Sequence, residues 1–159
     1  MLELSREDQD IISSLKAAGV LQPLDPDKLP VNAAEEAAMC FGIFCSDGHR
    51  FSNTYGHLEM LLNRRGRSKI HTFADHGAPL FLSHESPLNR NQRGNNLLDS
   101  IGEVPVIQKV AAGLICPHAP CGAATLFKLN VAQQIAHAKA GKIRILTAFP
   151  GIYAESNIT

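Results

Sequence analysis

The fold of this chain is decided by the stretch Ala38-Met39-Cys40-Phe41-Gly42-Ile43-Phe44-Cys45, a continuous apolar run that ends at a cysteine. A short apolar run without polar alternation is typical of a strand that is buried on both faces of a parallel sheet. Three further segments have the character of strands, at residues 69–74, 111–116 and 142–148. The sequence therefore predicts a central sheet of about four strands.

Helical patterns lie between these strands, at residues 53–62, within 91–109 and at 122–140, where Gly141 is expected to end the last helix. Strands that alternate with helices predict right-handed crossovers and a mostly parallel sheet flanked by helices, which is an α/β fold. We expect one domain over residues 1–159, because a chain of this length forms one core.

The first 30 residues are expected to form a helical arm of this domain. Ser5 and the acidic residues after it predict a helix that ends at Gly19. Three prolines within residues 21–30 then interrupt regular structure. Such an arm packs either on a second subunit or back on its own domain, and the sequence leaves both alternatives open.

Composition excludes several classes of partner. Fifteen basic and fifteen acidic side chains balance, so no overall field favours nucleic acid or an anionic membrane. The basic stretch at residues 64–69 is interpreted as a solvated turn, with anion binding as the alternative. The acidic start and the absence of a long apolar run predict neither a signal peptide nor a membrane span, so we expect a soluble cytoplasmic protein.

The four cysteines divide into two kinds. Cys40 and Cys116 lie within predicted strands and are expected to be core residues. Cys45 ends the first strand, whereas His118 and Cys121 follow the third, and ligand sites form at the carboxyl ends of parallel strands. Two sulfurs and one imidazole suit zinc, and three protein ligands leave a fourth position for water. The sequence thus predicts a zinc site.

Cys45-Ser46-Asp47 together with His118-Ala119-Pro120-Cys121-Gly122 resembles the paired zinc motifs of the β-class carbonic anhydrases, Cys-x-Asp-x-Arg and His-x-x-Cys-Gly. The resemblance extends from about residue 38 to residue 148. It implies a β-carbonic anhydrase-like fold and zinc on Cys45, His118 and Cys121. It also implies that Asp47 either accepts a hydrogen bond from zinc-bound water or occupies the fourth metal position.

The activity that this resemblance implies is that of a zinc-dependent hydro-lyase or hydrolase. Zinc-bound hydroxide would attack a small-molecule substrate, which is carbon dioxide, bicarbonate or a similar small electrophile. The family resemblance also suggests a homodimer or a higher homo-oligomer.

Two positions depart from the family pattern. His49 stands where the family has arginine, with Arg50 one residue later, and Pro117 stands where the family usually has glycine. Imidazole lacks the guanidinium fork that would hold Asp47 by two hydrogen bonds. Asp47 therefore either binds zinc directly, or His49 becomes a titratable partner for proton transfer, so Asp47 and His49 are the predicted catalytic residues.

Two other hypotheses belong to different classes. In the first, Asp47 completes a closed site of four protein ligands, and zinc contributes to folding without catalysis. In the second, Cys45 and Cys121 form a metal-free redox pair of thiols.

Overall fold

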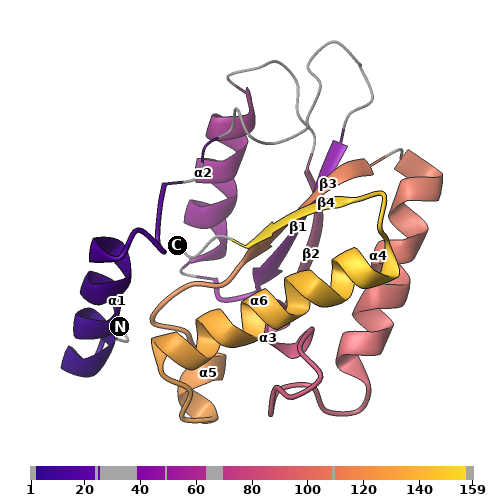
Figure 1. Cartoon of the computed structure of the whole chain (residues 1–159). Coiled ribbons are helices and arrows are strands. Elements are labelled where there is room, and N and C mark those ends of the chain that lie inside the picture. The colour runs from indigo at the N-terminus through magenta and orange to yellow at the C-terminus, as the bar shows by residue number, and fades with distance from the viewer. Residues whose placement is uncertain are drawn as a thin grey trace.

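The computed structural model describes residues 3–23, 25, 39–48, 50–63, 70–108 and 110–156. One sheet contains four strands in the order β2-β1-β3-β4, and every neighbouring pair is parallel (Figure 1). The prediction of an α/β fold with a parallel sheet of about four strands is confirmed. The strands are β1 (Met39–Cys45), β2 (Ile70–Asp75), β3 (Val110–Cys116) and β4 (Tyr153–Ser156).

Helices cover both faces of this sheet (Figure 1). On one face, three of them pack against the strands and against one another, namely α3 (Ala78–Phe81), α4 (Arg93–Gln108) and α6 (Val131–Ala148). On the other face, α2 (Phe51–Asn63) contributes Leu58 to a smaller apolar cluster. The short helix α5 (Gly122–Leu126) and the N-terminal helix α1 (Arg6–Ala17) complete the described elements.

Strand β1 supplies residues to both cores. Phe41, Ile43 and Cys45 belong to the larger cluster, whereas Cys40 and Phe44 belong to the smaller one. Successive side chains of a strand point to opposite faces, so a strand covered on both sides must be apolar at every position. This requirement explains the unbroken apolar run of residues 38–45 in the sequence.

The prediction of a strand at residues 142–148 is wrong, because these residues form the end of α6. The buried positions of this helix recur at helical spacing as far as its last turn, namely Val131, Gln134, Ile135, Ala138, Gly141 and Ile145. The fourth strand is β4, which pairs with β3 after the turn that follows α6.

The prediction that Gly141 ends the helix is wrong, because α6 continues to Ala148. An added Cβ at Gly141 would lie 2.9 Å from the Cβ of Leu82, directly after α3. The glycine therefore lets α6 pass close to the chain after α3, and the helix continues beyond it. The predicted helix at 122–140 is also divided, because Lys128 has a left-handed backbone with φ of 55° between α5 and α6.

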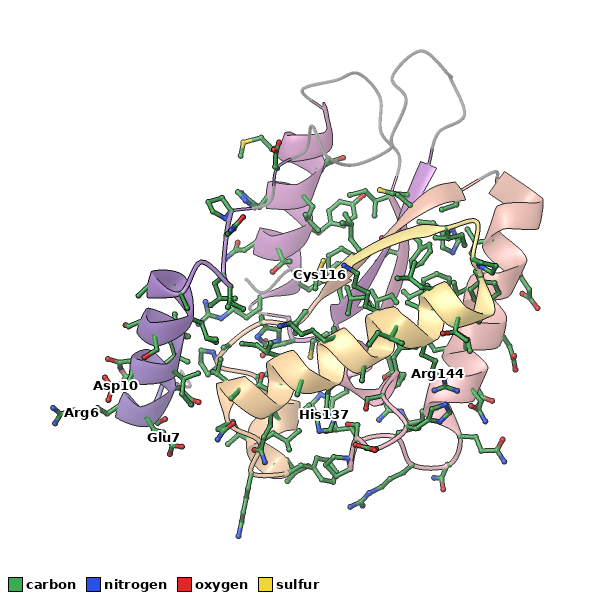
Figure 2. The ribbon with its side chains drawn as sticks, viewed as in Figure 1. Arg6, Glu7, Asp10, Cys116, His137 and Arg144 are labelled. Carbon is green, nitrogen blue, oxygen red and sulfur yellow. The ribbon has the colours of Figure 1, made fainter. Side chains whose placement is uncertain are left out.

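Helix α1 begins as expected, with the Ser5 hydroxyl accepting a hydrogen bond from the Asp8 amide at 3.1 Å. The Oδ1 atom of the Asp8 carboxylate accepts a hydrogen bond at 2.8 Å from the amide of Val131, in the first turn of α6. Of the two packing alternatives for the arm, the structure thus has α1 in contact with its own domain. Arg6, Glu7 and Asp10 point away from that contact (Figure 2).

Two parts of the sequence interpretation lie outside the described residues, namely His49 and the basic stretch at residues 64–69. Within the described residues, no helix combines the length and the apolar character needed to cross a bilayer.

A glycine in β3 provides a test of the core. Phe41 of β1 lies opposite Gly113 of β3, and an added Cβ at Gly113 would come within 2.2 Å of the Phe41 ring. We expect Gly113→Ala to lower the free energy of unfolding by about 1–3 kcal/mol, because overpacking forces a buried ring to move. Urea denaturation measures this change.

The matched control is Gly56→Ala in α2, where an added Cβ meets no atom within 4 Å. This substitution should raise the free energy of unfolding by roughly 0.5–1 kcal/mol, because alanine is the better helix former. Equal effects of the two substitutions would contradict the close packing of the Phe41 ring on β3.

Candidate metal centre

The sheet brings two distant segments of the chain to one edge. Phe44 of β1 pairs with Cys116 of β3, and both strands end within one residue of that pair. Cys45 is the last residue of β1, whereas the chain after β3 runs through His118 to Cys121, which is the N-cap of α5. The predicted meeting of Cys45, His118 and Cys121 therefore occurs.

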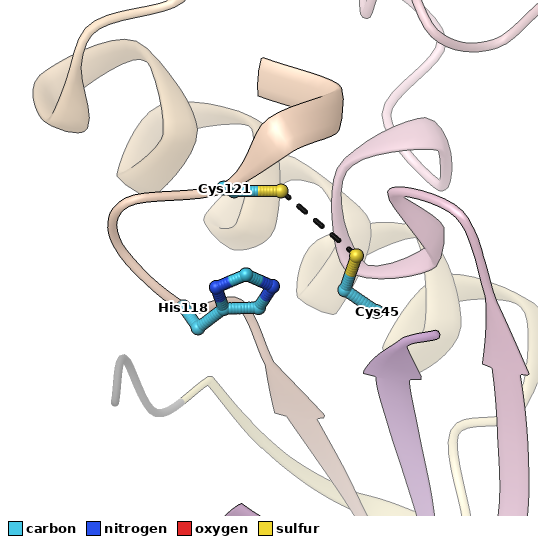
Figure 3. A group of neighbouring side chains, drawn as sticks. All are labelled: Cys45, His118 and Cys121. Carbon is cyan, nitrogen blue, oxygen red and sulfur yellow. Dashed lines mark hydrogen bonds between the residues drawn. The ribbon is translucent and has the colours of Figure 1, made fainter. Parts of the chain in front are cut away.

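The three side chains form a compact group of metal-binding character (Figure 3). The Sγ atoms of Cys45 and Cys121 are 3.9 Å apart, and one ligand atom from each of the three residues lies within 4.8 Å of the other two. The side chains are buried, with exposed fractions of 3%, 4% and 3% for Cys45, His118 and Cys121. No second group of three or more such side chains occurs in the part of the chain that the structure describes.

The loop fixes the orientation of the His118 ring. Its Nδ1 donates to the carbonyl oxygen of Pro120 at 3.0 Å. Nε2 then carries a lone pair, and this atom is buried without a hydrogen-bond partner of ordinary geometry. A buried polar atom without a partner costs roughly 1–3 kcal/mol. The arrangement therefore lacks one electron-pair acceptor, which a metal ion beside the two sulfurs would provide.

The sulfurs are electrostatically unequal. The Cys121 thiol donates a hydrogen bond to Cys45 and thereby holds the pKa of Cys45 well below its ordinary value, while burial opposes this effect. The backbone amides of Gly77 and Asp47 also lower the pKa of Cys45. The same hydrogen bond and burial raise the pKa of Cys121. The pair thus holds one proton between two sulfurs, which a cation can replace.

Of the two predicted catalytic residues, Asp47 belongs to the part of the chain that the structure describes, whereas His49 does not. Asp47 is half-buried two residues after Cys45, and its backbone carbonyl accepts hydrogen bonds from the amides of Arg50 at 3.0 Å and Phe51 at 2.8 Å. These bonds begin helix α2. The Asp47 carboxylate is not part of the three-residue group, so its role as a fourth ligand stays a prediction.

Sequence reasoning missed a further contact to Cys45. The Gly77 amide donates to the Cys45 Sγ at 3.4 Å, and the Asp75 carbonyl accepts a hydrogen bond from the Ser46 amide at 3.1 Å. Both contacts follow from the pairing of β1 with β2, in which Cys45 lies opposite Asp75. The turn after the second strand could be identified in the sequence by its glycine, but only the strand register shows that it reaches the cysteine.

No protein-family model and no curated protein sequence matches this chain. Among solved structures, the chain is similar to the β-carbonic anhydrase CafD of the filamentous fungus Aspergillus fumigatus. A mutant of CafD gives a TM-score of 0.48 at 14% identity, over 87% of this chain and 91% of that chain. The wild type gives 0.45 at 15% identity, over 87% and 92%. Both alignments extend over most of this chain.

The backbone at Gly77 generates a prediction. Gly77 has φ of 74°, and an added Cβ would lie 2.3 Å from Leu88 Cδ2 and 3.1 Å from Ala123 Cβ. We expect Gly77→Ala to lower the free energy of unfolding by about 2–4 kcal/mol, because left-handed strain and overpacking add. Thermal and urea denaturation measure the change.

Gly48→Ala is the control, since an added Cβ at Gly48 meets no atom within 4 Å. That substitution should stay within about 0.5 kcal/mol of the wild type. A Gly77→Ala protein as stable as the Gly48→Ala protein would show that the turn at Gly77 tolerates a side chain.

Proposed function

We propose that this protein binds one zinc ion through Cys45, His118 and Cys121 and catalyses a carbonic anhydrase-type reaction. The substrate is carbon dioxide or a similar small electrophile. The observation that carries the proposal is the buried Nε2 atom of His118, which has no partner and belongs to a group with two cysteine sulfurs.

The donor set fits zinc better than other common metals. Two sulfurs and one imidazole nitrogen suit a borderline-soft ion, whereas magnesium and calcium prefer oxygen ligands. Two thiolates that share a tetrahedral zinc ion at about 2.3 Å lie roughly 3.8 Å apart. The separation of 3.9 Å between the Cys45 and Cys121 sulfurs agrees with that value and is far longer than a disulfide bond.

A zinc ion with three protein ligands keeps one position for water and lowers the pKa of that water toward neutrality, which is the chemistry that hydration of carbon dioxide requires. We propose that the Asp47 carboxylate accepts a hydrogen bond from the reacting water and orients it. The imidazole of His49 is proposed to carry the proton away, since its ordinary pKa lies near neutral pH. The buried side chains of Ala123 and Ala124, which follow Cys121 and Gly122, support a site from which bulk water is excluded.

The homodimer or higher homo-oligomer and the cytoplasmic location are kept as proposals. The dimer comes from the resemblance of the two zinc motifs to the β-class family. The location comes from the lack of a long apolar run in the sequence.

The metal site is tested by zinc stoichiometry. The wild-type protein should retain about one zinc ion per chain after gel filtration, measured by mass spectrometry of the metal. Cys45→Ala, His118→Ala and Cys121→Ala should each weaken zinc binding by more than the roughly 10–100-fold that loss of an outer hydrogen-bond partner costs. A competing chelator with a coloured zinc complex gives these affinities.

Cys116→Ala is the matched control, because Cys116, labelled in Figure 2, is equally buried. It does not belong to the three-residue group. Its zinc affinity should equal that of the wild type. A wild-type protein that takes up no zinc, or three ligand variants that bind zinc like Cys116→Ala, would overturn the proposed site.

The reaction is tested by stopped-flow hydration of carbon dioxide over a pH series that includes alkaline values. We expect a rate that depends on zinc and falls by about 10²–10⁴-fold when Asp47→Asn and His49→Ala are combined, because positioned proton acceptors contribute on this scale. If loss of the Asp-Arg pair limits activity, His49→Arg, which restores the arginine of the family motif, should raise the rate.

One result would count against this function, and a second would count against the account of the missing arginine. Zinc binding without hydration at any pH would favour the closed, non-catalytic site in which Asp47 is the fourth ligand. An unchanged rate in His49→Arg would exclude the loss of that arginine as a limit on activity.

A further inference from the structure

The Cys45 sulfur depends on the turn at residues 75–77 for one of its hydrogen bonds. The Gly77 amide lies 3.4 Å from the Cys45 Sγ, and the next element, α3, begins at once after this glycine. A backbone amide can donate to a thiolate only while its peptide plane is held in one orientation. Whatever fixes this turn therefore also fixes the donor to the candidate metal ligand.

The Arg93 guanidinium holds both sides of that turn from outside the metal centre. Its Nη2 forms an ion pair with the Asp75 carboxylate at 2.8 Å and donates to the His76 carbonyl oxygen at 3.1 Å. The other carboxylate oxygen of Asp75 accepts the His76 amide at 2.6 Å. The amide and carbonyl of His76 are thus both engaged, and the peptide bond that follows this carbonyl carries the Gly77 amide.

The position of Arg93 is itself fixed. Arg93 is the first residue of α4, and its guanidinium lies 4.3 Å from the centre of the Phe81 ring. A guanidinium stacked on an aromatic face and paired with a carboxylate loses little freedom when it binds. Arg93 and Asp75 are nevertheless partly exposed, at 32% and 60%, so their ion pair adds little to overall stability.

We propose that Arg93 is a positioning residue of the metal centre: through Asp75 and the His76 peptide it holds the Gly77 amide on the Cys45 sulfur. This inference rests on the proposed zinc site. Arg93 acts three steps from the metal ligand and touches neither ligand nor substrate. Outer hydrogen bonds of this kind typically change metal affinity by 10–100-fold.

The surroundings of Arg93 make a mild substitution feasible. With Asp75, Phe73 and Leu97, its side chain lines an open cavity of about 280 Å³ beside β2. A shorter side chain at this position enlarges an existing open space and leaves the core filled. Arg93→Gln therefore removes the contacts to the turn without a new buried void.

The experiment measures amide exchange at Gly77 and zinc affinity separately. Amide hydrogen exchange at Gly77, followed by nitrogen-resolved NMR of the metal-free protein, should be about tenfold faster in Arg93→Gln than in the wild type. Zinc affinity from chelator competition should be about tenfold weaker. In cobalt-substituted protein, the sulfur-to-cobalt charge-transfer band should shift, because the Cys45 sulfur loses a hydrogen bond.

Arg90→Gln is the matched control. Arg90 lies three residues earlier, and its guanidinium stacks over Phe127 at 4.6 Å and donates to the Pro87 carbonyl, away from the turn. It should leave all three measurements unchanged. Asp75→Asn provides a second route if Arg93→Gln does not fold, and combining the two variants should cost less than the sum of their single effects if they act as one unit.

The outcomes separate the two proposals. Equal Gly77 exchange in the wild type, Arg93→Gln and Arg90→Gln overturns the positioning role. Faster Gly77 exchange with unchanged zinc affinity also overturns it. A wild-type protein that binds no zinc overturns the proposed function, while exchange in the metal-free protein still decides whether Arg93 fixes the Gly77 amide.

Discussion

The parallel pairing of β1 with β3 is the constraint on which the candidate metal centre depends. Phe44 lies opposite Cys116, so β1 ends at Cys45 while the loop that contains His118 leaves the sheet at the same edge. A shift of this register by two residues would move Cys45 by about 6.6 Å along the strand. That shift exceeds the 3.9 Å between the two sulfurs, and burial of β1 on both faces resists it.

The two kinds of buried cysteine differ in the hydrogen-bond donors around the sulfur. In the interior of the sheet, burial raises the pKa of Cys40 to about 11, and it also raises the pKa of Cys116, so both remain inert thiols. Cys45 is equally buried, yet the Cys121 thiol and the Gly77 amide favour its charged form. A buried sulfur becomes a candidate ligand when donors surround it, and the edge of the sheet is where loops can supply those donors.

The predictions from sequence succeeded where a local pattern of residue types determines the local structure. The apolar run before Cys45 indicates a strand covered on both faces, and the cysteines and the histidine at two strand ends indicate the cluster. The prediction of a strand at residues 142–148 was wrong because an apolar helix end and a short strand have similar composition. Only the helical spacing of the buried residues of α6 distinguishes the two.

Contacts that depend on three-dimensional placement could not be predicted. The orientation of the His118 ring depends on where the Pro120 carbonyl lies, and the hydrogen bond from Gly77 to Cys45 depends on the register of β2 against β1. The role of Gly141 also depends on a distant neighbour. Its lack of a side chain allows close contact with Leu82 and does not mark a turn. Neighbours that are distant in sequence determine all three.

The hydrogen bond between the Asp8 carboxylate and the Val131 amide joins α1 to the start of α6. A helix start normally finds its caps within its own segment, as α6 does in part through Asn130 and Gln133. Here one further amide of the first turn, that of Val131, is capped by Asp8 of α1, which lies 123 positions earlier. Detachment of α1 would therefore expose the Val131 amide to solvent and promote fraying of the first turn of α6.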